Sequence, residues 1–259
     1  MDNKASSVPD HSTPISSEAL LQLINVSIQS GNPLILRSAN LSGANLSETT
    51  LIGADLCNAD MPEVDMHHAD LRGANLSRAK LVFADLSRFA NLSKANMHCA
   101  DIRGANLKNA NLREANLTKT RLSTAFLREA DMRDADMRDA DMRGANLYRA
   151  NLCRAILSRA DMRGANLAQA DLKGVTLHQA NIRDAQLNGA NMREADVREA
   201  NLTRSDMTEN DLREANLCGS DMREANLNKA LLTNAKYNSE TKWPEGFDPV
   251  VAGAVFVNT

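Results

Sequence analysis

The sequence predicts an all-β solenoid, because apolar residues recur every five positions over most of the chain. The period runs unbroken from Leu36 to Leu86, takes one six-residue step to Leu92, and then resumes as far as Tyr237. All 41 of these positions, called central positions below, are apolar. A second series lies two residues before each central position, and 33 of its 41 members are alanine.

No single regular element explains a five-residue period. In an α-helix, a step of five residues rotates the side chain by about 140°, so the central residues would spread around the helix. In a flat strand, the same step moves the side chain to the opposite face each time. We therefore predict a corner in every repeat, which turns each short segment so that its central residue points into one narrow core.

The remaining positions of the repeat fit a chain that turns at every corner. The residue before each central position is usually Asn or Asp, which faces outward and suits turn-rich backbone. The single inserted residue, near Ser87 to Phe89, is expected to form a bulge at a corner. Phe83 and Phe89 are expected on the surface, either as a small recognition patch or as drift of the repeat. Glycines suit turns that need positive φ, notably Gly73, Gly104, Gly144 and Gly164.

The repeat resembles that of the pentapeptide-repeat family. The resemblance is carried by AN-L-SG-AN-L at Ala39 to Leu46 and by A-D/N-L/M-R-x over long stretches, and matching repeats fill residues 34–239. It implies a right-handed quadrilateral β-helix with four repeats per coil. About ten coils spaced by ~4.8 Å would give a rod about 50 Å long. The tail from Thr241 resembles tails of family members from photosynthetic bacteria.

Both ends of a solenoid need a cap, because each would otherwise expose the core. Residues 1–15 are expected to be disordered and residues 16–33 to form a short capping α-helix. Ser16 is the predicted N-cap, with Ile15 and Leu20 as a hydrophobic staple. A partner-binding or membrane-surface helix is the alternative, but its polar face lacks the basic residues typical of membrane binding. The expected apolar stripe is Leu20, Leu21, Leu23, Ile24 and Ile28, and Gly31 and Pro33 end the helix.

Residues 240–259 are predicted to cap the last coil or to form an interface. Pro244 and Pro249 favour a folded-back loop over a long helix. A monomer is expected, and end-to-end dimerisation through the same apolar patch stays open. The side chains expected to cover the last coil are Trp243, Phe247, Val250, Val251, Val255 and Phe256.

Nothing in the sequence indicates a catalytic, cofactor or metal site. The four cysteines, Cys57, Cys99, Cys153 and Cys218, include no CxxC pair. HExxH, GxSxG, Walker and GxGxxG motifs do not occur. The net charge of −3 gives no bulk attraction to nucleic acid or to anionic membranes. No apolar run reaches the ~20 residues of a membrane span, and we expect a cytoplasmic protein.

The outward arginines supply a candidate interaction face. Five of them follow central positions on one predicted side of the rod: Arg103, Arg143, Arg163, Arg183 and Arg223. They form either a basic stripe for an acidic partner or a charge ladder neutralised by aspartates two residues earlier. On another side, Arg113, Arg133, Arg193 and Arg213 are expected to pair with the acidic residues that directly follow them.

Two functions remain open at this stage. The first is a non-enzymatic binding or scaffold protein with an unknown protein partner. The second is suggested by the family resemblance, since some members mimic DNA, bind DNA gyrase and confer quinolone resistance. That role needs a strongly acidic surface, whereas this chain has 33 acidic and 30 basic residues.

Overall fold

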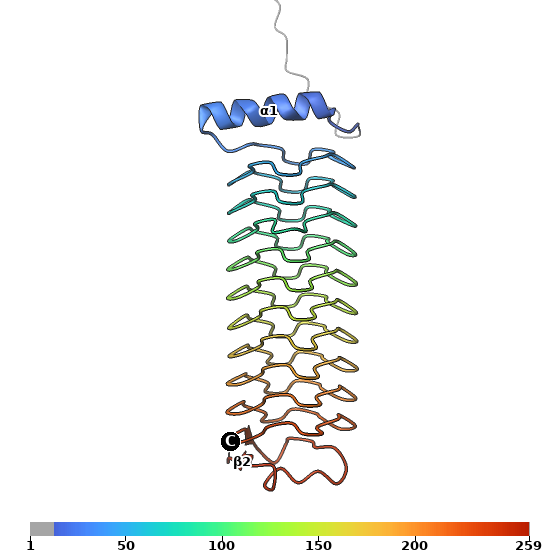
Figure 1. Ribbon diagram of the computed structural model, residues 1–259, viewed down its shortest axis with the longest axis vertical. Helices are drawn as coiled ribbons and strands as arrows, with labels where there is room; N and C mark the ends of the chain where they lie inside the picture. The colour runs from blue at the N-terminus through green and yellow to red at the C-terminus, as the bar shows by residue number, and fades with distance from the viewer. Residues whose placement is uncertain (1–12, 259) are drawn as a thin grey trace, which may run out of the picture.

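The computed structural model describes residues 13–258 as one straight rod of stacked coils (Figure 1). The helix α1, Ser17–Ser30, lies across one end of the rod. The strands β1, Lys236–Tyr237, and β2, Val255–Phe256, pair in parallel near the other end. Between these ends each coil lies directly on the next.

The backbone pairing fixes four sides per coil. The residue before each central position pairs in parallel with the residue 20 positions further on, as in Asn40 with Asp60 and Asn45 with Asp65. Since the repeat has five residues, a step of 20 residues contains four repeats and therefore four sides. The fold is the predicted right-handed quadrilateral β-helix.

One repeat shows how the backbone groups are satisfied. In the repeat Ala145–Arg149, the Ala145 N–H closes a turn onto the Met142 carbonyl (3.0 Å). The N–H groups of Asn146, Leu147 and Arg149 donate to carbonyls of the adjacent coils at 2.9, 2.7 and 3.1 Å. Only the Tyr148 N–H lacks a carbonyl partner, and the Asn146 side-chain Oδ1 accepts it (3.1 Å). Because buried backbone donors need partners, this Asx hydrogen bond explains why 31 of the 41 equivalent positions are Asn or Asp.

Each corner, except the one that holds the insertion, contains one residue in the left-handed region. The second residue after each central position, from Ser38 to Asn234, has φ between 54° and 71°. The positive φ at this position alone matches a type II turn. The four glycines expected in turns occupy such corners: Gly73, Gly104, Gly144 and Gly164.

The core consists of the two inward positions of every repeat. All central residues from Leu36 to Leu232 are buried, and so are nearly all the alanines two residues before them. Polar residues at the alanine position bond to carbonyls within the rod. Thr120 Oγ1 donates to the Met97 carbonyl (2.9 Å), and Asn210 Nδ2 donates to the Leu187 carbonyl (3.0 Å).

The inserted residue is absorbed at a corner, as predicted. The pairing offset is 21 residues from the pair Asp70–Asn91 to the pair Asp85–Asn106, and is 20 again from the pair Asn91–Asn111 to the pair Asn216–Lys236. Arg88 and Phe89 both have positive φ, and the Ala90 N–H closes the turn onto the Ser87 carbonyl (3.2 Å). The register of the core therefore continues through the insertion.

The helix α1 covers the first coil. Ser16 Oγ accepts the Ala19 N–H (3.3 Å), and Gly31, with φ 67°, ends the helix. Ile15 packs against the core and donates its N–H to the Asn40 carbonyl (2.9 Å). The buried stripe is narrower than expected, because one helix touching a flat coil end buries a single line of side chains. Leu20 and Ile24 are buried, whereas Leu21, Leu23 and Ile28 are exposed. Residues 1–12 of the segment expected to be disordered lie outside the described residues.

The tail folds back on the last coil. Backbone pairing extends to Lys242, which pairs with Asp221, and β2 then pairs with β1. The Tyr237 ring contacts the rings of Trp243 and Phe256, both with centroids 5.5 Å away, and Trp243 stacks on Phe247 at 5.1 Å. Three of the residues expected in the cover do not contribute to it, since Val250, Val251 and Val255 are 67%, 84% and 46% exposed.

The buried central series predicts a large penalty for a charge at Leu152. Leu152→Asp places a carboxylate without a partner in the core and should destabilise the rod by about 4 kcal/mol or more. Leu152→Met keeps the volume and should cost less than about 1.5 kcal/mol. Thermal unfolding followed by circular dichroism measures both, and equal melting temperatures for wild type and Leu152→Asp would contradict the assignment.

The packed tail predicts that truncation after Tyr237 uncovers the last coil. The truncated rod loses Trp243 and Phe247, exposes apolar surface and should self-associate, while the full chain remains monomeric in light scattering. A dimeric full chain together with a stable monomeric truncation would show instead that the tail is an interface.

Candidate interaction surfaces

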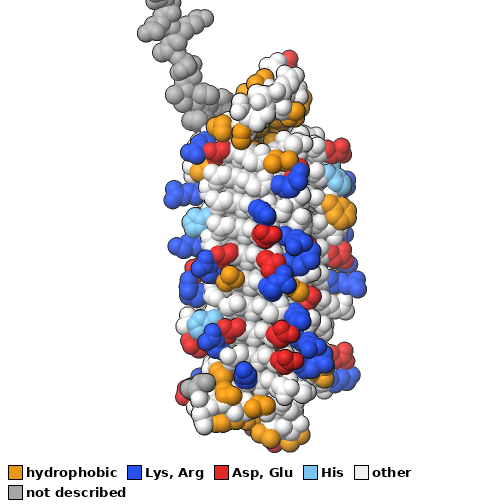
Figure 2. All heavy atoms as spheres, turned by 90° about the vertical axis from the view of Figure 1, so that its left-hand side faces the viewer, with side chains coloured by type: hydrophobic (Ala, Val, Ile, Leu, Met, Phe, Trp, Pro, Cys, Tyr) orange, Lys and Arg blue, Asp and Glu red, His pale blue; other side chains and the backbone are white. Residues whose placement is uncertain are grey.

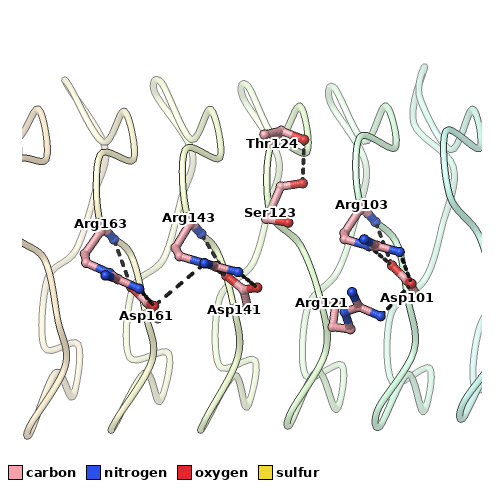
Figure 3. Close-up of polar contacts among 9 residues, drawn as sticks. All are labelled: Asp101, Arg103, Arg121, Ser123, Thr124, Asp141, Arg143, Asp161 and Arg163. Atoms are coloured by element: carbon pink, nitrogen blue, oxygen red, sulfur yellow. Dashed lines mark hydrogen bonds and ion pairs between the residues drawn. The ribbon is translucent and has the colours of Figure 1, made fainter.

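The five arginines of the candidate interaction face, here called the arginine ladder, lie on one side of the rod. Figure 3 shows three of them, Arg103, Arg143 and Arg163, each beside the aspartate two residues earlier in the chain. Arg143 Nε and Nη2 donate to Asp141 Oδ1 and Oδ2, both at 2.7 Å. Arg103, Arg163 and Arg223 bind the aspartates two residues earlier in the same way. Arg183 differs because residue 181 is Asn, and its Nε lies 3.3 Å from Asp184.

These pairs neutralise the ladder. The Arg143 guanidinium holds the pKa of Asp141 below its ordinary value, and a backbone N–H bond acts in the same direction against the opposing effect of burial. The Arg223 guanidinium lowers the pKa of Asp221 in the same way. The five arginines thus lie on one side as predicted, but each already has a carboxylate partner.

The pairing expected on the second side is wrong, because none of its four arginines forms an ion pair with the acid that directly follows it. Arg133 and Arg213 bind Asp131 and Asp211, two residues earlier, at 2.5 Å. The acid that follows each arginine occupies a corner, and a corner side chain reaches along the rod to the neighbouring coil. Partners from neighbouring coils therefore face these acids: Lys94 for Glu114, Arg154 for Asp134, Lys173 for Glu194 and Arg193 for Glu214.

One face of the rod mixes both charges. In Figure 2, basic and acidic side chains alternate along the rod, and hydrophobic side chains concentrate at the two ends. Among the described residues no three His, Cys, Asp or Glu side chains are grouped as metal ligands. A shallow surface hollow lies beside the folded tail, lined in part by Arg198, Cys218 and Glu240.

A different side carries the aromatic residues of the repeats. Phe83 and Phe89 lie at the two corners that bound this side in one coil, and they are 67% and 71% exposed. Phe126 belongs to the same side, because it pairs with Asn106, which pairs with Asp85. Tyr148 lies in the next coil, two residues after the Phe126 partner Asn146. Sequence reasoning identified Phe83 and Phe89 but missed Phe126 and Tyr148, whose shared side follows only from the 20-residue register.

The repeats match the family model for pentapeptide repeats in eight copies, which together span residues 39–236. The chain belongs to the pentapeptide repeat family. No curated protein sequence is significantly similar to it.

Solved structures place this pentapeptide repeat protein near cyanobacterial relatives. HetL, a pentapeptide repeat protein involved in heterocyst differentiation regulation in the cyanobacterium Nostoc sp. strain PCC 7120, is 29% identical. The match covers 84% of this chain and 92% of HetL, with a TM-score of 0.61. A second pentapeptide repeat protein from Nostoc PCC 7120 is 35% identical over 40% of this chain and 86% of its own, with a TM-score of 0.29. QnrB1, a plasmid-mediated fluoroquinolone resistance protein, is 16% identical over 81% of this chain and 90% of its own, with a TM-score of 0.43.

The ladder predicts a stability contribution that depends on pH. Because the folded-state pKa values of Asp141 and Asp221 are lowered, their contribution is present above the unfolded pKa of about 4 and is lost as the pH falls through the folded value. The double variant Arg143→Gln/Arg223→Gln should melt below the wild type at pH 7. The two melting curves should converge in acid, and a difference that persists undiminished at pH 2 would contradict the ion-pair account.

Proposed function

We propose that this pentapeptide repeat protein is a non-enzymatic scaffold that binds another protein through its sides. The observation that carries the proposal is the set of large aromatic side chains that the rod leaves in solvent. Phe83, Phe89 and Phe126 are more than half exposed although every repeat has two buried positions available. Exposed apolar groups on a rigid framework are typical of interaction sites.

The shape of the molecule supports the same proposal. Two inward positions per repeat fill the core, so function is left to the outward side chains of the four sides. Each coil presents such side chains at a spacing of about 4.8 Å, which suits an extended interface. HetL is described as involved in the regulation of differentiation, and we propose a regulatory contact of this general kind here.

The compartment and assembly form part of the proposal. All four cysteines are free, which is expected in the reducing cytoplasm. No helix in residues 13–258 is long and apolar enough to cross a bilayer. We place the protein in the cytoplasm as a monomer, with both ends of the rod covered.

In-cell crosslinking followed by reconstitution tests the proposal. After crosslinking in the native host, one protein should be recovered in larger amount with the wild-type full chain than with the core variant Leu152→Asp. That protein should bind the purified full chain in calorimetry. The proposal fails if no enriched protein binds the purified chain.

The charge pairing also predicts that this protein does not inhibit DNA gyrase. A DNA mimic must present a continuous acidic surface, whereas here basic residues pair with many of the acidic ones, as in Arg159 with Asp139 and Lys229 with Glu209. Purified protein should leave gyrase supercoiling unchanged. Stoichiometric inhibition in that assay would establish the alternative function.

A further inference from the structure

We infer that the aromatic side of the rod binds an acidic, amphipathic helical segment of the protein partner. The aromatic side is defined here as the outward side chains of residues 83–89, 104–109, 124–129 and 144–149, which are successive coils of one side. The inference rests on the proposed scaffold function and specifies the face and the chemistry of its partner.

The aromatic residues of the repeats are confined to this side. Between Leu34 and Lys236 the chain has only four Phe, Tyr or Trp residues, and all of them belong to the aromatic side. They are Phe83, Phe89, Phe126 and Tyr148. Aromatic side chains supply much of the binding energy at protein interfaces, so their convergence on one of four sides favours a docking surface there.

The position of Phe126 is unfavourable for the rod by itself. It occupies the site that is Asn or Asp in most repeats, so it offers no side-chain acceptor to the Arg128 N–H two residues later. Phe126 is also 53% exposed, so its ring gains little from burial. Stability does not account for a phenylalanine here, whereas a contact with a partner does.

Phe83 and Phe89 are held outward by the backbone. Phe83 has φ 59° at a corner, and its ring lies over Gly104 in the next coil. A Cβ at Gly104 would come within 2.5 Å of that ring, so a larger residue there would push the ring aside. Phe89 is directed outward by the one-residue insertion, and its ring centroid lies 6.4 Å from that of His68. The two rings thus lie at the two corners that bound the aromatic side in one coil.

This side carries four basic residues against two acidic ones, and one of its arginines, Arg128, pairs with Glu129 at 3.2 Å. Arg88, Lys108 and Arg149 are exposed and form no ion pair within residues 13–258. Arg128 and Arg149 lie over the Tyr148 ring at 5.0 and 5.8 Å. On the arginine ladder, by contrast, a partner carboxylate would have to replace an aspartate that already binds each guanidinium. An acidic partner is therefore favoured on the aromatic side.

The spacing of the rings fits a helix that lies along the rod. Phe126 lies two coils, or about 10 Å, along the rod from Phe83 and Phe89. Tyr148 lies three coils, or about 15 Å, from the same two residues. Apolar residues at i, i+7 and i+11 of a helix are separated by about 10.5 and 16.5 Å from the first. Single-stranded nucleic acid would need a continuous basic groove, which Asp85 and Glu129 interrupt.

A synthetic helix tests this inference directly. The probe is a peptide with leucine at i, i+7 and i+11 and glutamate at most other positions, compared with the same peptide carrying lysine in place of glutamate. Fluorescence anisotropy with the full chain should show the acidic peptide binding about tenfold tighter or more. Equal affinity for both peptides, or tighter binding of a thymidine oligonucleotide, overturns the inference.

Surface variants locate the site. The triple variant Phe83→Asn/Phe89→Asn/Phe126→Asn should bind the acidic peptide about tenfold more weakly or worse. The melting temperature of this variant should equal or exceed that of the wild type, because asparagine tolerates positive φ and restores the Asx acceptor. Ile156→Asn is the matched control, since Ile156 is an exposed apolar residue at the Phe126 position of another side. It should leave binding unchanged, and equal losses in both variants contradict the inference.

The native partner separates this inference from the proposed function. If the partner found by crosslinking binds the triple variant as well as the wild type, the scaffold function stands and the aromatic side is the wrong face. If no partner binds the wild-type chain, the proposed function itself fails. If the partner binds the wild-type chain but not the triple variant, the result supports both the scaffold function and the aromatic side as its binding face.

Discussion

The left-handed residue at every corner is the constraint on which the rest of the rod depends. It turns the chain after each short segment and allows two residues of every five to point inward. Most of these corner residues are not glycine, although a left-handed conformation costs an L-residue about 1–2 kcal/mol. Each corner N–H, such as that of Glu48 to the His67 carbonyl (2.9 Å), donates to the next coil and offsets part of that cost.

The same geometry decides which charges meet. A residue directly after a central position lies on the same side as the residue two positions earlier, which produces pairs such as Arg198 with Asp196 at 2.7 Å. A corner residue lies above the corner residue of the next coil, which produces pairs such as Arg204 with Asp184 at 2.6 Å. Charge pairing along the rod is thus a consequence of the repeat. The aromatic side differs from the rest of the rod because the repeat, and with it the pairing, is interrupted there.

The aromatic side is such an interruption. Phe126 replaces an Asx acceptor, Phe83 replaces a polar or glycine corner, and Phe89 comes with the single change in period. All three depart from the rule that serves stability, and all three lie on one side within three successive coils. Departures that cluster in space while costing stability are expected at functional sites.

The sequence by itself determined the solenoid, its buried residues and the position of the bulge, because a strict five-residue period admits few backbone solutions. It also located the capping helix from Ser16, Leu20 and Gly31, which are local signals. The tertiary structure decided which side chains share a side across the insertion: Phe83 and Phe126 are 43 residues apart, and the 20-residue register combined with the insertion places them on one side, two coils apart. It likewise decided that corner acids pair between coils, because the direction of a corner side chain depends on backbone conformation and not on sequence distance.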